Sequence, residues 1–550
     1  MALLEIENLS LTLAGRPLLK RVSLTVRRGE VLGLVGESGS GKSLTALSIL
    51  GLPPAGAVLS GAVRLQGADL LSLDDTAMGA VRGRDIGMVF QEPMTALNPV
   101  RCIGDQVAET VRLHRGVSRA EANAVTARTL ARVGMPAEHF PLSRYPHELS
   151  GGQRQRVAIA IAVALAPKLI LADEPTTALD VTTQAQILDL LIQLSREDGA
   201  GLVLVSHDLA LIAQAADRVV VMQAGEIVDQ GETAAFFNTL AHPYSRALAA
   251  AVEPRMRAAR APSSEPPVLE AHDVIRAYSG RRTSLFKPGV SQRAVDKVSL
   301  TLAPGENLGL VGESGSGKTT LARAILGLDA ASEGDIRLGG EAFSRANPAD
   351  RRRLRRRIQA VFQDPFSSFD PRWRVADIVA EPFALFDAPP QGRERRRRVE
   401  AMLEQVGLSS ADADRFPHQF SGGQRQRIAI ARALITEPSV VVLDEATSAL
   451  DVTVRAQVLA LLDDLSQRLG VSYLFVSHDL AVVRAITDRV MVMRAGRIVE
   501  TGPTAEVFAA PRHPYTAQLI AASPNLARAL AERKTRYAAA SAANSNEAAP

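Results

Sequence analysis

The stretch GESGSGKS runs from Gly36 to Ser43, and GESGSGKT runs from Gly312 to Thr319. The first copy begins at the end of an apolar run, EVLGLVG, and is followed by a helical pattern, LTALSILGL. In a loop between a strand and a helix, glycines let successive backbone N–H groups converge on phosphate oxygens, and a lysine adds a point charge. The two stretches therefore predict two phosphate-binding loops.

The two loops belong to a tandem repeat that fills most of the 550-residue chain. Asp173 and Asp444 match at the same offset as His207 and His478. We assign one domain to residues 1–251 and a second to 269–525, separated by a Pro- and Ser-rich linker at 252–268. The low-complexity tail at 526–550 is expected to be disordered.

The composition is that of a globular protein, with 46% apolar and 22% charged residues. A net charge of +4 gives little support for nucleic-acid binding. The single cysteine, Cys102, excludes an intramolecular disulfide and any multi-cysteine metal site, and we read it as a small apolar filler. Apolar runs stay shorter than the roughly 18–20 residues of a membrane helix, so we expect no membrane span.

Short β-branched runs alternate with helical patterns in both halves, which predicts a largely parallel α/β sheet in each. Two of these runs, LILADE and VVVLDE, end in paired carboxylates. Asp173 and Asp444 are placed to hold Mg²⁺, and Glu174 and Glu445 would act as general bases toward water. A solvated strand end is the alternative, and the neighbouring phosphate loop argues against it.

The sequence SGGQRQR occurs at 150–156 and again at 421–427, each time before a helical pattern. Its hydroxyl, glycines and amide predict a second anion-binding helix N-terminus in each half. A single domain has no evident use for two phosphate cradles, whereas two facing domains do.

With these motifs in this order, the chain resembles the ATPase subunits of ABC transporters. Gln91 and Gln363 match the Q-loop, His207 and His478 match the switch histidine, and residues 178–180 and 449–451 match the D-loop. The resemblance implies two P-loop ABC-type nucleotide-binding domains in tandem that bind ATP and Mg²⁺ and hydrolyse ATP. Each would have a RecA-like parallel-sheet core, a helical subdomain and an antiparallel β subdomain.

The SGGQ segments at 150–153 and 421–424 match the family's signature. The resemblance also implies that each ATP lies between the phosphate loop of one copy and the signature of the other. The nucleotide-binding residues implied for the first site are Gly36, Glu37, Ser38, Gly39, Ser40, Gly41, Lys42, Ser43, Ser421, Gly422, Gly423 and Gln424. Those implied for the second site are Gly312, Glu313, Ser314, Gly315, Ser316, Gly317, Lys318, Thr319, Tyr278, Ser150, Gly151, Gly152 and Gln153. The implied metal ligands are Ser43, Gln91, Asp173, Thr319, Gln363 and Asp444, and the implied catalytic residues are Glu174, Glu445, His207 and His478.

The adenine-stacking position differs between the copies. Aligning NLSLTL with DVIRAY places Leu13 opposite the aromatic Tyr278, so only the second copy has a ring there.

Two further elements indicate the branch of the family. HPYSRAL at 242–248 and HPYTAQL at 513–519 resemble the C-terminal element of dipeptide, oligopeptide and nickel importer ATPases, and their histidines suit packing better than metal binding. QEPMTALNP and QDPFSSFDP resemble the segment after the Q-loop that, in importers, lines the groove for a membrane subunit. The fused arrangement is similar to that of glutathione and microcin C importer ATPases.

The implied function is to power peptide import with two membrane-spanning permease subunits and an extracytoplasmic substrate-binding protein. The chain would be peripheral on the cytoplasmic face of the bacterial inner membrane and would bind no nucleic acid. A soluble tandem ATPase acting on ribosomes or DNA is the alternative, which the short linker and both HPY elements disfavour. Peptide, glutathione, opine and nickel cargoes all stay open at this point, with peptide favoured.

Overall fold

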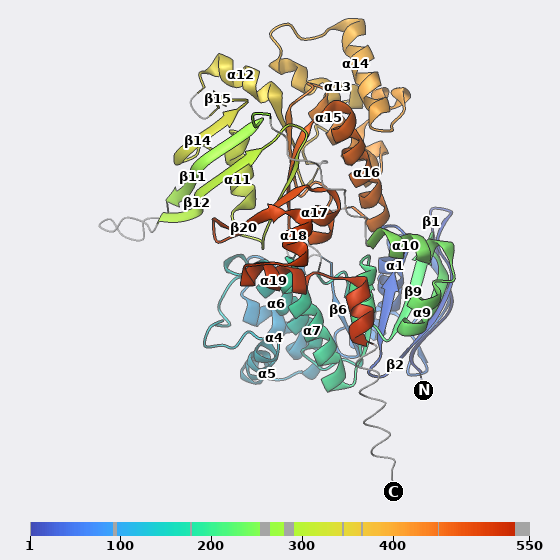
Figure 1. Ribbon diagram of the computed structural model, residues 1–550. Coiled ribbons are helices and arrows are strands. Elements are labelled where there is room, and N and C mark those ends of the chain that lie inside the picture. Colours follow the sequence, from blue (N-terminus) through green and yellow to red (C-terminus); the bar gives the residue numbers. More distant parts are fainter. Residues whose placement is uncertain are drawn as a thin grey trace. The chain divides into compact units, whose positions relative to one another are not determined.

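The computed structural model describes residues 2–91, 96–176, 179–252, 265–279, 291–343, 346–364, 367–448 and 450–533. These residues form two compact units. The first domain contains residues 2–252 together with 524–533, and the second contains residues 265–523. Figure 1 shows sheets flanked by helices in each of them.

The first domain contains two sheets. A four-stranded antiparallel sheet has the order β2-β1-β4-β5, and a six-stranded sheet has the order β10-β9-β3-β8-β7-β6, in which only the β9–β10 pair is antiparallel. The strands are β1 (Ala2–Leu13), β2 (Arg16–Arg27), β3 (Val31–Val35), β4 (Ala57–Leu65), β5 (Ala68–Asp69), β6 (Ile86–Val89), β7 (Leu169–Asp173), β8 (Gly201–Ser206), β9 (Arg218–Gln223) and β10 (Glu226–Glu232).

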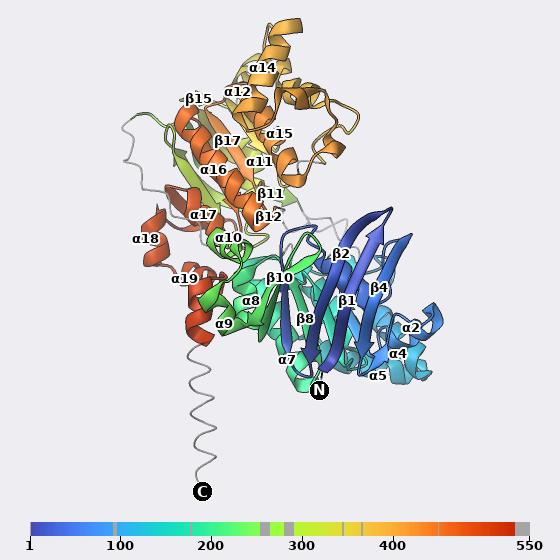
Figure 2. The same cartoon turned by 90° about the vertical axis from the view of Figure 1, so that its right-hand side faces the viewer.

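Helices α4, α5 and α6 pack on one another to form a helical subdomain, while α8, α9 and α10 gather on the β10 side of the main sheet (Figure 2). The labelled α-helices of the first domain are α1 (Lys42–Ile49), α2 (Asp75–Val81), α4 (Ile103–Arg115), α5 (Arg119–Arg132), α6 (Gly151–Val163), α7 (Val181–Asp198), α8 (Leu209–Ala215), α9 (Thr233–Thr239) and α10 (Pro243–Val252).

The second domain repeats this plan, with sheets in the orders β12-β11-β14-β15 and β16-β17-β18-β13-β19-β20. Its strands are β11 (Leu269–Ser279), β12 (Ser291–Leu302), β13 (Asn307–Val311), β14 (Glu333–Leu338), β15 (Glu341–Ala342), β16 (Ile358–Val361), β17 (Val440–Asp444), β18 (Ser472–Ser477), β19 (Arg489–Arg494) and β20 (Arg497–Pro503). Its helices are α11 (Lys318–Ile325), α12 (Pro348–Arg357), α13 (Val375–Ala380), α14 (Gly392–Gln405), α15 (Gly422–Leu434), α16 (Val452–Leu469), α17 (Leu480–Ile486), α18 (Thr504–Ala509) and α19 (Pro514–Ala522). The predicted α/β fold class is confirmed.

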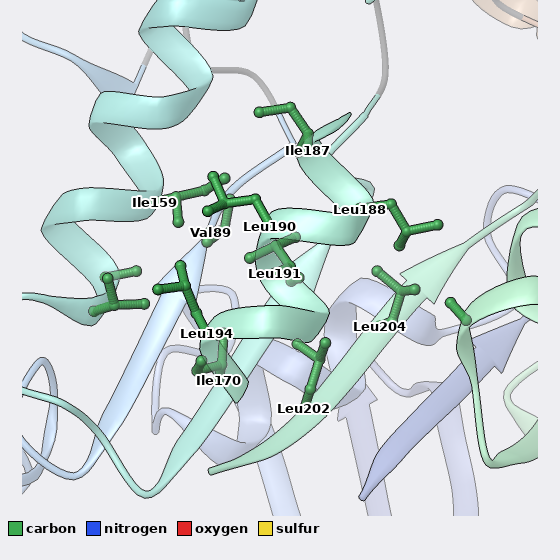
Figure 3. Close-up of a cluster of buried hydrophobic side chains, with 14 of the residues drawn as sticks. Val89, Ile159, Ile170, Ile187, Leu188, Leu190, Leu191, Leu194, Leu202 and Leu204 are labelled. Atoms are coloured by element: carbon green, nitrogen blue, oxygen red, sulfur yellow. The ribbon is translucent and has the colours of Figure 1, made fainter. Parts of the chain in front are cut away.

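The first domain's core shows why the main sheet is so apolar. Helix α7 starts at the N-cap Asp180 and buries Ile187, Leu191 and Leu194, whose spacing places them on one helix face. Figure 3 shows this face packed against side chains of β6, β7 and β8, with α6 alongside. Each such side chain stabilises the fold by about 1.5–3 kcal/mol, so Leu191→Ala would leave a costly cavity.

The C-terminal segment differs from the expected disorder. Residues 526–533 are helical and belong to the first domain, where Ala529 is buried and Leu526 and Leu530 pack beside it. Arg533 anchors the end: its guanidinium lies 3.6 Å from the Asp217 carboxylate. The expectation was wrong here because apolar residues spaced three and four apart make one face of a short helix, which low complexity conceals. Residues 534–550 lie outside the described residues.

Arginines on α12 and α14 form ion pairs within the second domain. Arg353 on α12 pairs with Glu341, and Arg396 on α14 pairs with Asp414 at 2.7 Å. These ion pairs offset part of the positive charge that the arginines place on α12 and α14. Within the described ranges, no helix is long and apolar enough to cross a bilayer.

Candidate nucleotide-binding site

Each glycine-rich loop connects a buried strand to a helix. Helix α1 follows Gly41, which has a φ of 103° and carries no side chain that could cap the helix. Gly39 has a φ of 77°, which is also in the left-handed region that glycine tolerates. In the second copy, Gly317 and Gly315 have φ values of 106° and 80°. The first N–H groups of α1 and α11 therefore form uncapped anion-binding ends.

The lysine of each loop is buried and folds back on its own loop. Lys42 is 5% exposed, and its ammonium donates to the carbonyl oxygens of Gly36 and Glu37, both at 2.8 Å. Lys318 makes the same two bonds in its copy, at 2.8 and 2.9 Å. A buried ammonium needs such partners, and it lies beside the helix end where a phosphate would add the opposite charge.

A carboxylate and a hydroxyl meet next to each lysine. Asp173, at the end of β7, accepts a hydrogen bond from the Ser43 hydroxyl at 3.1 Å. Burial, with repulsion from Glu174, raises the pKa of Asp173. Burial likewise raises the pKa of Asp444 to about 6, and Thr319 lies 3.4 Å from it. A hard cation would offset the cost of each buried charge, so this pair of oxygen ligands fits Mg²⁺.

In the first copy, the predicted general base, Glu174, directly follows Asp173 in the sequence. Glu174 sits at a φ of 44°, and its carboxylate Oε2 lies 3.2 Å from both the Gln91 amide and His207 Nδ1. The turn thus places glutamate, Q-loop glutamine and switch histidine in one cluster at the end of the strand.

The second copy repeats the glutamate–histidine pair. Glu445 has a φ of 50°, and its Oε1 lies 3.0 Å from His478 Nδ1. Burial alone would raise the pKa of Glu445, but the hydrogen bond and charge of His478 leave it below its usual value. The carboxylate is therefore ionised at neutral pH, as a base must be. Gln363 is exposed at the end of β16.

The signature serines cap helices. Ser150 accepts from the backbone N–H of Gln153 at 3.3 Å, and the Gln153 side chain accepts from the Ser150 N–H at 2.9 Å. Ser421 and Gln424 form the same box at the start of α15. A Cβ on Gly152 would lie 2.5 Å from the methyl of Thr183 on α7, so any larger residue would force Thr183 to shift. The signature thus presents a compact helix N-terminus on each domain.

The strand register gives the alignment of the two positions predicted to stack on adenine. Asn8 on β1 and Asp273 on β11 have matching positive φ values of 50° and 47°. Counting on from them places Leu13 and Tyr278 at equivalent positions. Tyr278 is 43% exposed, with the Arg276 guanidinium 4.9 Å from its ring centroid. One face of the ring is therefore covered by a cation.

Several sequence-predicted residues have local roles or lie outside the described ranges. Asp180 caps α7, whereas Ala178 and Ala449 of the D-loops are outside those ranges, as are residues 92–95 and 365–366 after the Q-loops. Among the residues that the structure does describe, no three His, Cys, Asp or Glu side chains form a metal cage. A metal would thus share its coordination with hydroxyl, water and phosphate oxygens.

Sequence reasoning missed one contact of the phosphate loops. The tyrosines of both HPY elements, Tyr244 and Tyr515, hydrogen-bond to backbone of the loops. The available signal was that both HPY elements recur at the same offset as the catalytic motifs.

Comparison with known families identifies the class. The ABC transporter family model matches residues 19–177 and 295–448, and the chain belongs to this family. The model of the oligopeptide/dipeptide transporter C-terminal region matches residues 228–282 and 499–548. The chain is thus an ATP-binding, ATP-hydrolysing subunit of an ABC transporter, and the ribosome or DNA alternative is not supported.

Among curated proteins, the chain is similar to two ATP-binding proteins of transport systems. It is 46% identical to the glutathione import ATP-binding protein GsiA of Shigella dysenteriae serotype 1, over 92% of this chain and 86% of that one. It is 48% identical to the peptidoglycan transport ATP-binding protein YejF of Agrobacterium fabrum, over 92% of both chains. These similarities confirm the expected branch of importer ATPases.

Solved structures match one domain's length. CbiO1 of Clostridium perfringens, part of an ABC transporter complex, is 28% identical, with 45% of this chain and 92% of that chain covered at a TM-score of 0.39. An ATP-binding cassette dimer bound to ADP and phosphate is 28% identical, covering 43% and 98% at a TM-score of 0.39.

Proposed function

We propose that the chain powers the import of peptide-class solutes by binding and hydrolysing two ATP molecules. The observation that carries this proposal is the cluster of a buried lysine and a buried aspartate with a hydroxyl, a glutamate and a histidine, present once in each domain. The HPY elements and the similarity to import ATPases support the direction and the class of cargo.

The residues of one site divide the work. Lys42 and the N–H groups of α1 would hold the terminal phosphates, and Glu174 would accept a proton from the attacking water. His207 orients that carboxylate from 3.2 Å. Mg²⁺, held by Ser43 and through water by Asp173 and Gln91, would neutralise charge on the phosphates. Lys318, Thr319, Gln363, Asp444, Glu445 and His478 would do the same in the second site.

We further propose that the signature of each domain completes the site of the other. Ser421 to Gln424 would bind the ATP held by Lys42, and Ser150 to Gln153 would bind the ATP held by Lys318. The helix caps at both signatures favour an anion. One chain with both domains raises their effective concentration for pairing.

The partners in this proposal are two permease subunits and, through them, an extracytoplasmic binding protein. Exposed apolar side chains close in sequence to the Q-loop segments support a docking face: Phe90 and Val100 in the first domain and Trp373 in the second. Their exposed fractions range from 42% to 79%, unusual for such residues. The chain would then be peripheral on the cytoplasmic membrane face.

The test is reconstitution with permease subunits, chosen from any permease genes that neighbour the gene of this chain. Proteoliposomes with the binding protein should take up a labelled peptide only when MgATP is supplied on the side of this chain. Reduced glutathione and Ni²⁺ serve as competing cargoes. Glutathione is included because it is a tripeptide and is the import substrate in the name of a relative. Copurification with ribosomes and no permease would contradict the proposal.

A further inference from the structure

The HPY element of each domain reaches the phosphate loop through a tyrosine hydroxyl. In the first domain, the backbone N–H of Glu37 donates to Tyr244 Oη at 3.0 Å. In the second domain, the N–H of Glu313 donates to Tyr515 Oη, again at 3.0 Å. Both tyrosines lie in the first turn of a helix, α10 or α19, and each contact joins residues more than 200 positions apart.

The bonded peptide is the one that also holds the lysine. The Gly36 carbonyl, which shares a peptide group with the Glu37 N–H, accepts from the Lys42 ammonium at 2.8 Å, and the Gly312 carbonyl accepts from Lys318 at 2.8 Å. A continuous chain of hydrogen bonds therefore runs from the phenol through one loop peptide to the phosphate-binding lysine. It is present in both domains.

The tyrosine is itself fixed by the histidine and by an acidic residue on the edge strand of the sheet. His242 Nδ1 accepts from the Tyr244 N–H at 3.2 Å, and the His242 N–H donates to Asp229 on β10 at 3.1 Å. In the second domain, the corresponding distances are 3.1 Å from the Tyr515 N–H to His513 and 3.0 Å from the His513 N–H to the edge strand β20.

The surroundings of the two tyrosines differ although the contact is the same. Tyr515 is 3% exposed, and the Arg494 guanidinium lies 4.8 Å from its ring centroid. Tyr244 is half-buried, and Gln223 occupies the position that corresponds to Arg494. Packing alone would not require a hydroxyl at either position, because phenylalanine would fill the same volume.

We propose that Tyr244 and Tyr515 are positioning residues for ATP binding, each fixing the loop of its own domain so that the lysine and the helix N–H groups meet the phosphates. This inference rests on the proposed nucleotide sites. Without the hydroxyl, the loop N–H loses this hydrogen bond, and the loop samples conformations in which the lysine is misplaced. Nucleotide binding must then also order the loop, which lowers the affinity.

Tyr244→Phe and Tyr515→Phe, made separately, test the proposal because each chain carries its own control loop. Hydrogen exchange of the nucleotide-free protein, followed by mass spectrometry, should show faster exchange in the peptide covering residues 36–43 of Tyr244→Phe. The peptide covering residues 312–319 should be unchanged, and Tyr515→Phe should give the reverse pattern. This arm needs no nucleotide, so it remains informative even if ATP fails to bind and the proposed function falls.

The second arm measures nucleotide. One of the two ATP-binding events should weaken by about 2- to 12-fold in each variant, the equivalent of one ordinary hydrogen bond. KM for ATP should rise while kcat changes little, because the glutamate–histidine pairs are untouched. Tyr145→Phe is the matched control: this tyrosine is 41% exposed, and its ring stacks on His147.

Unchanged exchange in both loops would overturn the proposal. So would faster loop exchange with unaltered ATP affinity, because the contact would then have no bearing on binding. Faster exchange throughout the domain with a lowered melting temperature would also overturn it, since that outcome indicates a purely structural tyrosine.

Discussion

Replacing Glu174 and Glu445 by glutamine together should leave ATP binding intact and nearly abolish hydrolysis. A glutamine keeps the size of the side chain and one oxygen that can face the histidine, from 3.2 Å in the first domain and 3.0 Å in the second. It cannot accept the proton of the attacking water. The change therefore separates binding from chemistry.

The magnitude follows from the role of a general base, which contributes about 10²- to 10⁴-fold to the rate. That corresponds to about 2.7–5.4 kcal/mol on the barrier. The whole effect should be felt at pH 7, because His478 lowers the pKa of Glu445 despite its burial. A depressed carboxyl pKa means the base is lost only as pH falls through that lowered value, well below neutrality.

Phosphate release in saturating MgATP measures the chemistry, and equilibrium dialysis with labelled ATP measures the binding. The single variants report whether the domains act independently. If they do, each single variant should keep the ATP turnover of the site that was not changed. Glu226→Gln is a matched control, since its carboxylate is 53% exposed and pairs with Lys20 on the surface. Turnover of the double variant within twofold of wild type would refute the assignment of both glutamates.

Three further outcomes are expected. In the double glutamine protein, Tyr278→Ala should weaken the tighter of two ATP-binding events by about 2- to 12-fold, and Leu13→Tyr should strengthen the weaker one. ATP affinities that stay the same in both variants would disprove the stacking role. Ala529→Asn should cost about 1–3 kcal/mol by burying an unpaired polar group, and should speed proteolysis between the second domain and the C-terminal helix; an unaltered cleavage rate would contradict the docking. The Cys102 thiol should alkylate more slowly than free cysteine at pH 8, because burial and then Asp105 raise its pKa, and fast alkylation would contradict that environment.

The parts of the fold that the sequence predicted depend on local signals. The strand before Gly36 is buried along its whole length, so its apolar run is continuous and easily read. The backbone angles of the phosphate loops require glycine. The acid pair that begins with Asp173 marks the end of an apolar strand, which the sequence also shows. Cys102 was interpreted less well: it is the N-cap of α4, and its thiol donates to Asp105 at 3.0 Å.

The parts that could not be predicted depend on contacts between distant segments. Leu526 and Leu530 make a helix face of only two turns, and nothing in their spacing says that it packs on the first domain. The hydroxyl of Tyr244 is an ordinary polar group until the fold brings Glu37 to it from 207 positions away. Hydrophobic periodicity indicates which face of an element is buried, but not which surface covers it.

The duplication itself helps to separate functional contacts from incidental ones. The two copies have diverged around the HPY tyrosine: the acid that fixes its histidine is Asp229 in one copy and Glu500 in the other, and the arginine over the ring occurs in only one. Yet the tyrosine-to-loop distance is 3.0 Å in both. If packing alone held this tyrosine, the contact should have varied with its surroundings, as the ring's exposure does. The hydroxyl contact is kept while the residues around the tyrosine change. A requirement for one geometry of the phosphate loop explains why both copies keep this contact. The same reasoning applied to Leu13 and Tyr278 gives the opposite result, since the surrounding strand is kept while the ring is not. The two sites should therefore hold phosphates alike and adenine differently.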